Sequence, residues 1–169
     1  NQLDILPRLL FKYSKNNAFE IHLQAYITKN YDTGNLANLL LSIRNQECWI
    51  GNEVSCGVGM QRIDIMLKQE NETDVYIRLI ELKDEAPYLA IIQYQLPWYL
   101  EWLSYYVLPK YSNKNVHVIP TIIGKGPLSN TLLSAYQSFA YTIPNVIVTP
   151  LEYIGFDITT TGINFTRYL

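Results

Sequence analysis

Apolar side chains in the first quarter of the sequence recur with the period of an α-helix. The segment SKNNAFEIHLQAYITKNY, residues 14–31, places four of them at i, i+4, i+7 and i+8, which predicts one amphipathic helix. These four are Phe19, Leu23, Tyr26 and Ile27. Either Asn16 or Asn17 is expected to cap its N-terminus. A turn at 32–34 and a short helix over 36–43 are expected to follow.

The apolar runs that come next are typical of strands. CWIGNEVSCGVGMQRIDIMLK, residues 48–68, predicts two strands joined near Gly57 and Gly59. The polar run QENETD, residues 69–74, predicts a turn, and residues 75–83 predict a further strand.

The second half of the sequence alternates helical and strand patterns. Residues 87–106 indicate a helix interrupted at Pro97, because proline removes a backbone donor and clashes with the preceding turn. NVHVIPTIIG and NVIVTP indicate strands on either side of a helix near residues 131–140. The order of elements predicts an α/β domain with a mixed central sheet flanked by helices.

Length and composition place the chain among globular proteins. It has 169 residues, of which 49% are apolar and 17% charged, so we expect one domain over residues 1–169. Because the sequence begins with Asn, we interpret it as trimmed or as a piece of a longer protein. No apolar run approaches the roughly 18 residues of a membrane span. With two cysteines, Cys48 and Cys56, and no visible export signal, an intracellular, cytoplasmic protein is expected.

Three charged residues interrupt the apolar strands. Glu81 and Lys83 are two residues apart, so they project from the same face of one strand, and Asp64 lies within the strand before it. If the two strands pair through the 69–74 turn, Asp64 comes beside Glu81. Two adjacent carboxylates repel, and a divalent cation such as Mg²⁺ relieves that repulsion. The alternative is an edge strand whose charged face is solvated.

The pattern of Asp64, sixteen intervening residues and then Glu81-Leu82-Lys83 resembles the PD-(D/E)XK nuclease superfamily. That superfamily includes type II restriction enzymes, archaeal Holliday-junction resolvases and RecB-like nucleases. The segment GMQRIDIML is also similar to an element of archaeal mismatch and single-strand endonucleases, and Ile63 replaces the Pro of the motif. The resemblance covers about residues 20–106 and implies a restriction-endonuclease-like fold.

The resemblance also implies a Mg²⁺-dependent DNA endonuclease of the restriction or repair type, with Mn²⁺ as a substitute. Asp64, Glu81 and the backbone carbonyl of Leu82 would hold the metal, while Lys83 would position the attacking water. Glu20 matches a further acid that the first helix of such enzymes often supplies, although a solvated helix face explains it almost as well.

Three other residues match expected DNA contacts. Gln95 and Tyr99 have the spacing of a Gln–Tyr pair in RecB-like members, with Gln93 as a competing candidate and a plain amphipathic helix as the alternative. Arg62 is either a phosphate contact or an ordinary surface residue.

Charge argues against a large nucleic-acid surface. The 13 basic and 15 acidic residues give a net charge of −2, so DNA binding would need a local patch, a homodimer or an additional domain. A second hypothesis is therefore a catalytically silent module of the same fold, for DNA binding or protein assembly, that docks through Trp98, Trp102 and neighbouring tyrosines.

Overall fold

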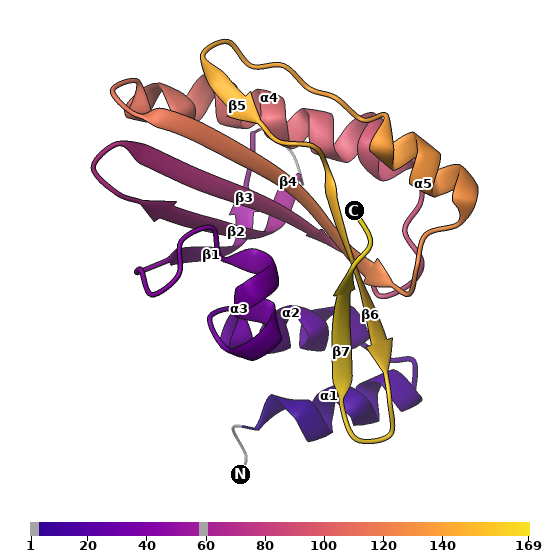
Figure 1. The fold of residues 1–169 in the computed structure, drawn as a ribbon. Coiled ribbons are helices and arrows are strands. Elements are labelled where there is room, and N and C mark those ends of the chain that lie inside the picture. Colours follow the sequence, from indigo (N-terminus) through magenta and orange to yellow (C-terminus); the bar gives the residue numbers. More distant parts are fainter. Residues whose placement is uncertain (1–3, 58–60) are drawn as a thin grey trace.

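A mixed β-sheet lies between two layers of helices in the computed structural model, which describes residues 4–57 and 61–169 (Figure 1). Within these residues the sheet has seven strands in the order β1-β2-β3-β4-β6-β7, with β5 paired to β4. The predicted α/β domain with a mixed sheet flanked by helices is confirmed.

The strands divide into an antiparallel half and a parallel centre. The antiparallel half consists of β1 (Trp49–Ser55), β2 (Arg62–Glu70) and β3 (Asp74–Leu82). The central strand β4 (Asn115–Lys125) runs parallel to β3 and to two later strands, β5 (Val146–Val148) and β6 (Glu152–Ile158). The antiparallel strand β7 (Ile163–Arg167) pairs with β6 and completes the sheet.

Each face of the sheet has its own hydrophobic core and its own helices. One face packs against α1 (Ile5–Ser14), α2 (Phe19–Asn30) and α3 (Gly34–Leu40). The other packs against the π-helical turn η1 (Ile91–Gln95), α4 (Leu96–Tyr106), the 3₁₀ turn η2 (Leu108–Tyr111) and α5 (Asn130–Gln137). Figure 1 shows α1 to α3 on one side and α4 and α5 on the other.

Alternation along β3 connects both cores. Ile77 and Leu79 belong to the core beneath α4, whereas Ile80 and Leu82 belong to the core beneath α2. Because both faces are covered, every residue of β3 from Ile77 to Leu82 is buried.

Several predicted details are wrong. Helix α2 begins after Ala18, whose φ of 52° is left-handed, and no side chain caps it, so neither Asn16 nor Asn17 serves as the predicted cap. The physical reason is the tight connection from α1, which places left-handed backbone at Asn16 and Ala18. The short helix predicted over 36–43 begins two residues earlier and ends at Leu40.

The predicted interruption lies before Pro97 rather than at it. Residues Ile91–Gln95 form a π-helical turn, and α4 then carries Pro97 in its first turn, where the missing N–H is tolerated. Gly57 lies just after β1 with φ of +102°, whereas Gly59 lies outside the described residues. Helix α1 and strands β6 and β7 were not predicted.

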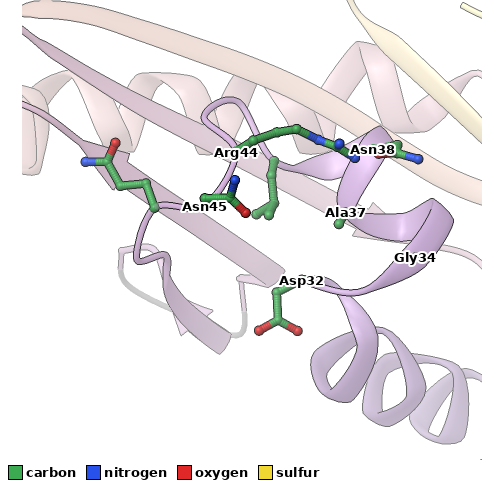
Figure 2. Close-up of a pocket in the computed structure, with 8 residues that line it drawn as sticks. Asp32, Gly34, Ala37, Asn38, Arg44 and Asn45 are labelled. Carbon is green, nitrogen blue, oxygen red and sulfur yellow. The ribbon is translucent and has the colours of Figure 1, made fainter.

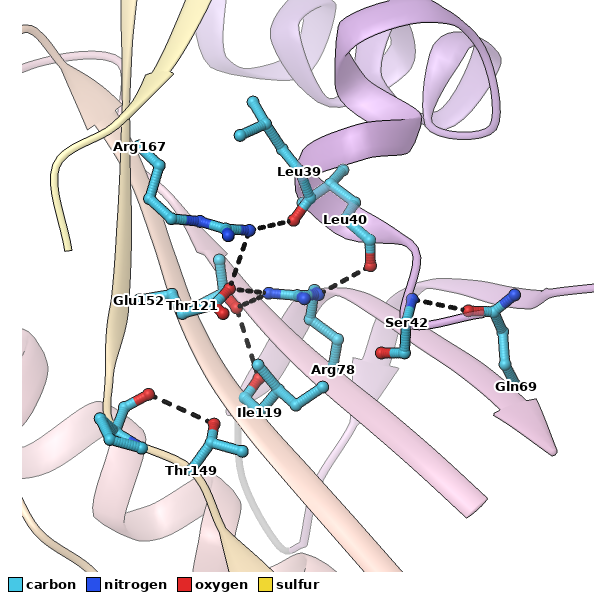
Figure 3. A network of polar contacts seen from close by, with 11 residues as sticks. Leu39, Leu40, Ser42, Gln69, Arg78, Ile119, Thr121, Thr149, Glu152 and Arg167 are labelled. Carbon is cyan, nitrogen blue, oxygen red and sulfur yellow. Dashed lines mark hydrogen bonds and ion pairs between the residues drawn. The ribbon is translucent and has the colours of Figure 1, made fainter. Parts of the chain in front are cut away.

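A buried arginine joins the sheet to α3 (Figure 3). Arg78 is 5% exposed, and its guanidinium donates to Glu152, to Thr121 Oγ1 at 2.8 Å and to the backbone carbonyl of Leu40 at 2.9 Å. Arg167, more exposed, donates to the carbonyl of Leu39 at 2.6 Å. Both arginines therefore satisfy carbonyl groups at the C-terminal end of α3, where positive charge is stabilising.

We expect Arg78→Met to lower the free energy of unfolding by about 3 kcal/mol, because it leaves a partly buried Glu152 and buried acceptors without their main donor. Arg167→Met is the matched control, and its exposed pair is worth under about 1 kcal/mol. Urea denaturation followed by circular dichroism measures both. Equal losses from the two variants would contradict this account of the network.

Candidate functional site

Asp64 and Glu81 meet where strands β2 and β3 separate. The antiparallel register pairs Ile65 with Ile80, and one further step along it brings Asp64 opposite Glu81. The regular pairing ends at that step, and Asp64 Oδ2 accepts a 2.7 Å hydrogen bond from the backbone amide of Leu82. The aspartate thus points toward the glutamate strand, as the sequence predicts.

Glu81 is held from two directions. It is 4% exposed, and its Oε1 lies 3.2 Å from Nζ of Lys83, two residues along the same face. Its Oε2 lies 3.1 Å from the hydroxyl of Tyr99, which reaches down from α4. The Tyr99 hydroxyl also lies 2.8 Å from the backbone carbonyl of Arg62, so it connects β2, β3 and α4 at one point.

Helix α2 approaches the same point from the other face of the sheet. The pKa of Glu20 is raised by burial and by the negative charge of Asp64, while Lys83 and the backbone amide of Asp84 partly offset the rise. One turn along the helix, Gln24 Nε2 donates to the backbone carbonyl of Asp64 at 3.1 Å. The sequence motifs do not identify Gln24 as a site residue. Its position four residues after Glu20, which places both on one face of the helix, is the pattern that could have indicated it.

The remaining predicted residues lie around this group. Arg62 is exposed at the start of β2, where its backbone carbonyl accepts a hydrogen bond from the Tyr99 hydroxyl. Gln95 ends the π-helical turn, and its buried Oε1 has no hydrogen-bond partner within the described residues. Tyr88 was not predicted, yet its ring centroid lies 5.4 Å from Nζ of Lys83. No short motif in the sequence identifies Tyr88.

Electrostatics at the site are dominated by two carboxyl groups within hydrogen-bonding reach of each other. Burial and the charge of Glu81 raise the pKa of Asp64 to about 8, although the Leu82 amide opposes the rise. Burial likewise raises the pKa of Glu81, against the opposing effect of Lys83. Burial lowers the pKa of Lys83, but the charge of Glu81 together with the hydrogen bonds to Tyr88 and Glu81 outweighs burial and raises the value to about 12.

The chemistry of these donors fits a hard divalent cation. The converging ligands are carboxylate oxygens, without thiolate or imidazole, and Mg²⁺ is commonly held by one or two carboxylates with water and substrate phosphate. Across residues 4–57 and 61–169, no group of three or more His, Cys, Asp or Glu side chains is arranged to hold a metal. Water or substrate would therefore have to complete the coordination. The predicted role of the Leu82 carbonyl stays a prediction.

A separate hollow lies at the other end of β2, around α3 and the loop after it (Figure 2). It measures about 490 Å³, and its polar lining includes Asp32, Asn38, Arg44 and Asn45. In Figure 2 the Arg44 side chain extends toward Asn38. Asp32 is the single acid among its lining residues, so this hollow offers no carboxylate pair.

Comparisons with known proteins assign no family to the chain. No model of a known protein family matches the sequence, and no curated protein matches it. Among solved structures, the fold is similar to that of SfsA from Pyrococcus furiosus, determined in complex with Ca²⁺, with a TM-score of 0.39 and 13% identity. The match covers 88% of this chain but 62% of SfsA. A likeness of this size decides neither the fold class nor the activity.

The structure also bears on membrane-spanning helices and on the two cysteines. Within the described parts of the chain, no helix is both long enough and apolar enough to cross a membrane. Cys48 and Cys56 are unpaired thiols, half-buried and buried respectively.

We expect Asp64→Asn to change how thermal stability depends on pH in metal-free buffer. The folded pKa of Asp64 is about 8, above the ordinary value near 4, so the native state binds more protons than the unfolded state across this window. Stability from this group is therefore present at low pH and is lost as pH rises toward 8. The melting temperature of the variant minus that of the wild type should grow from pH 5 to pH 8.

Glu72→Gln, in the exposed β2–β3 turn, is the control, and its difference from the wild type should stay constant over the same range. A constant difference for Asp64→Asn as well would show that the two carboxyl groups do not interact as described.

Proposed function

We propose that the chain is a Mg²⁺-dependent nuclease that hydrolyses phosphodiester bonds in DNA. The observation that carries this proposal is the meeting of Asp64, from β2, with Glu81 of β3 and its ion pair to Lys83, which directly follows that strand. The same three residues carry the resemblance of the sequence to the PD-(D/E)XK superfamily. Burying two carboxylates beside one ammonium group costs folding free energy. A cation that binds between the two carboxylates would offset this cost and explain the arrangement.

Asp64 and Glu81 are the residues that would hold the metal. When bound, a divalent cation neutralises the two carboxylates and stabilises the charge that develops on the phosphate. The Leu82 amide keeps one Asp64 oxygen in place, and Tyr99 does the same for one oxygen of Glu81. Fixed ligands of this kind avoid the cost of reorganisation during the reaction.

Lys83 would act on the nucleophile and the phosphate as a positively charged donor. Its ammonium group lies 3.2 Å from Glu81 and over the ring of Tyr88, so its direction is limited by two contacts. From there it can donate to an attacking water or to a phosphate oxygen. Glu20, on α2, would add a second acceptor for that water, and Arg62 would contact a flanking phosphate.

The acidic surroundings explain why recruitment of DNA would need further positive charge. Glu20, Asp64, Glu81 and Asp84 interact electrostatically near the site, whereas Lys83 is the basic group that interacts with Glu20 and Glu81. A homodimer or an additional domain would supply basic phosphate contacts beyond those of Lys83 and Arg62.

We expect Asp64→Asn, Glu81→Gln and Lys83→Met each to slow DNA cleavage at least about 100-fold, because each removes a group that contacts the metal, the water or the phosphate. Cleavage of circular duplex and single-stranded DNA with Mg²⁺ or Mn²⁺ measures this. Glu72→Gln is the control for the purification and should cleave at the wild-type rate. Equal rates for wild type and Glu81→Gln would indicate a contaminating nuclease and contradict the proposal.

Tyr99→Phe tests the positioning of Glu81. The variant keeps the buried ring but loses the hydroxyl between Glu81 and the Arg62 carbonyl, so we expect Mn²⁺ affinity to fall about 10-fold or more. Isothermal titration calorimetry measures this affinity without DNA. Tyr105→Phe, exposed on the same helix, is the matched control. Unchanged affinity in Tyr99→Phe would exclude a positioning role.

The silent-module hypothesis predicts a different result from the same calorimetry. The absence of a three-ligand cluster within the described residues is the observation that favours it. A wild-type protein that binds neither Mg²⁺ nor Mn²⁺ but self-associates stably would support assembly through Trp98 and Trp102 instead of catalysis.

A further inference from the structure

A hollow of about 470 Å³ lies beside the start of α4 and the π-helical turn before it. Amide and aromatic side chains make most of its wall, and Glu101 is the charged residue among those that line it. The lining residues are Gln61, Gln93, Tyr94, Gln95, Pro97, Trp98, Glu101 and Tyr141.

Two lining residues of the hollow are sequence neighbours of residues that contact each other at the carboxylate pair. Gln61 directly precedes Arg62, whose carbonyl accepts from Tyr99, and Trp98 directly precedes Tyr99. A molecule bound in the hollow would therefore contact residues that directly precede Arg62 and Tyr99 in the chain.

One wall of the hollow contains an acceptor without a partner. Oε1 of Gln95 is buried and makes no hydrogen bond within the described residues, and such a group costs free energy until a donor reaches it. Gln95 ends the π-helical turn, a backbone form often found at functional sites. Rotation of its side-chain amide would turn this acceptor toward a donor in the hollow.

Two aromatic side chains of the lining offer exposed surface. Trp98 is 43% exposed even though its Nε1 donates to the Cys56 carbonyl at 2.7 Å, so its ring is oriented before any ligand binds. Tyr94, one turn earlier along the chain, is 71% exposed. Large aromatic surfaces left in water beside a polar pocket are typical of stacking sites for flat ligands.

The negative charge of Glu101 determines which part of a nucleotide can bind in the hollow. Glu101 would repel a phosphate but can accept from an amino group or a ring N–H of a base. Gln61, Gln93 and Gln95 add neutral donors and acceptors of the kind that read base edges.

We propose that this hollow binds one unstacked nucleobase of the strand to be cut, with the ring against Tyr94 and Trp98 and the base edge on Gln95 and Glu101. This inference rests on the proposed nuclease function and narrows its substrate to DNA with an unpaired base. A base inside a duplex has both faces covered by its neighbours and cannot enter such a pocket without being extruded.

Binding of fluorescein-labelled ten-nucleotide strands, measured by anisotropy in low salt and EDTA, tests the inference without cleavage. One strand carries bases, and a matched strand carries abasic sugars with the same phosphates. We expect the wild type to bind the base-bearing strand at least about fivefold more tightly than the abasic strand and than the duplex.

Tyr94→Ala should bring the ratio between base-bearing and abasic strands toward one. Tyr105→Ala, similarly exposed but on α4 and not among the lining residues of the hollow, should leave the ratio unchanged. Gln95→Met removes the unpartnered acceptor without changing the size of the side chain, so it should lower the ratio while the protein stays at least as stable as the wild type. Equal binding of both strands by the wild type, or no effect of Tyr94→Ala, would overturn the base pocket.

Cleavage with Mg²⁺ separates this inference from the proposed function. A wild type that cuts DNA but does not distinguish base-bearing from abasic strands retains the nuclease function and loses the base pocket. A wild type that binds bases through Tyr94 but cuts no DNA retains the pocket and loses the nuclease function.

Discussion

The antiparallel register of β2 against β3 is the constraint on which the candidate site depends. Side chains alternate between the faces of a sheet, so a shift of one residue would turn Asp64 away from Glu81 and move the apolar residues beside it into the opposite core. The buried residues on both faces of β3 prevent that shift, because Leu79 and Ile80 belong to different cores. The hydrophobic cores therefore determine where the carboxylates meet.

Buried charges occur at two places on β3, and their partners compensate them to different degrees. Arg78 is matched by Glu152, by Thr121 and by a carbonyl at the end of α3, so its charge is compensated within the fold. Glu81 has Lys83 and Tyr99 as partners but also faces Asp64, a second acid. Burial and the charge of Glu81 raise the pKa of Asp64, so the two carboxyl groups are under-compensated. The first arrangement serves stability, whereas the second is the kind expected at a functional site.

Helix α4 connects the candidate chemistry with the candidate recognition of a base. Its inward face sends Tyr99 to Glu81, while its outward face presents Trp98 and, from the preceding π-helical turn, Tyr94 and Gln95. One helix would thus connect the proposed base pocket with Glu81. This arrangement would place the scissile phosphate relative to the base that is bound.

The sequence alone determined the periodic elements and the three residues of the motif. Helix α2, the β2–β3 hairpin and the meeting of Asp64 with Glu81 follow from local periods and from a short turn, which act over a few residues. Strands β6 and β7, the Arg78 network, and the contacts of Gln24 and Tyr88 at the site were decided by the tertiary structure. They join residues far apart in the chain, or side chains whose direction depends on packing, and no local pattern encodes such contacts.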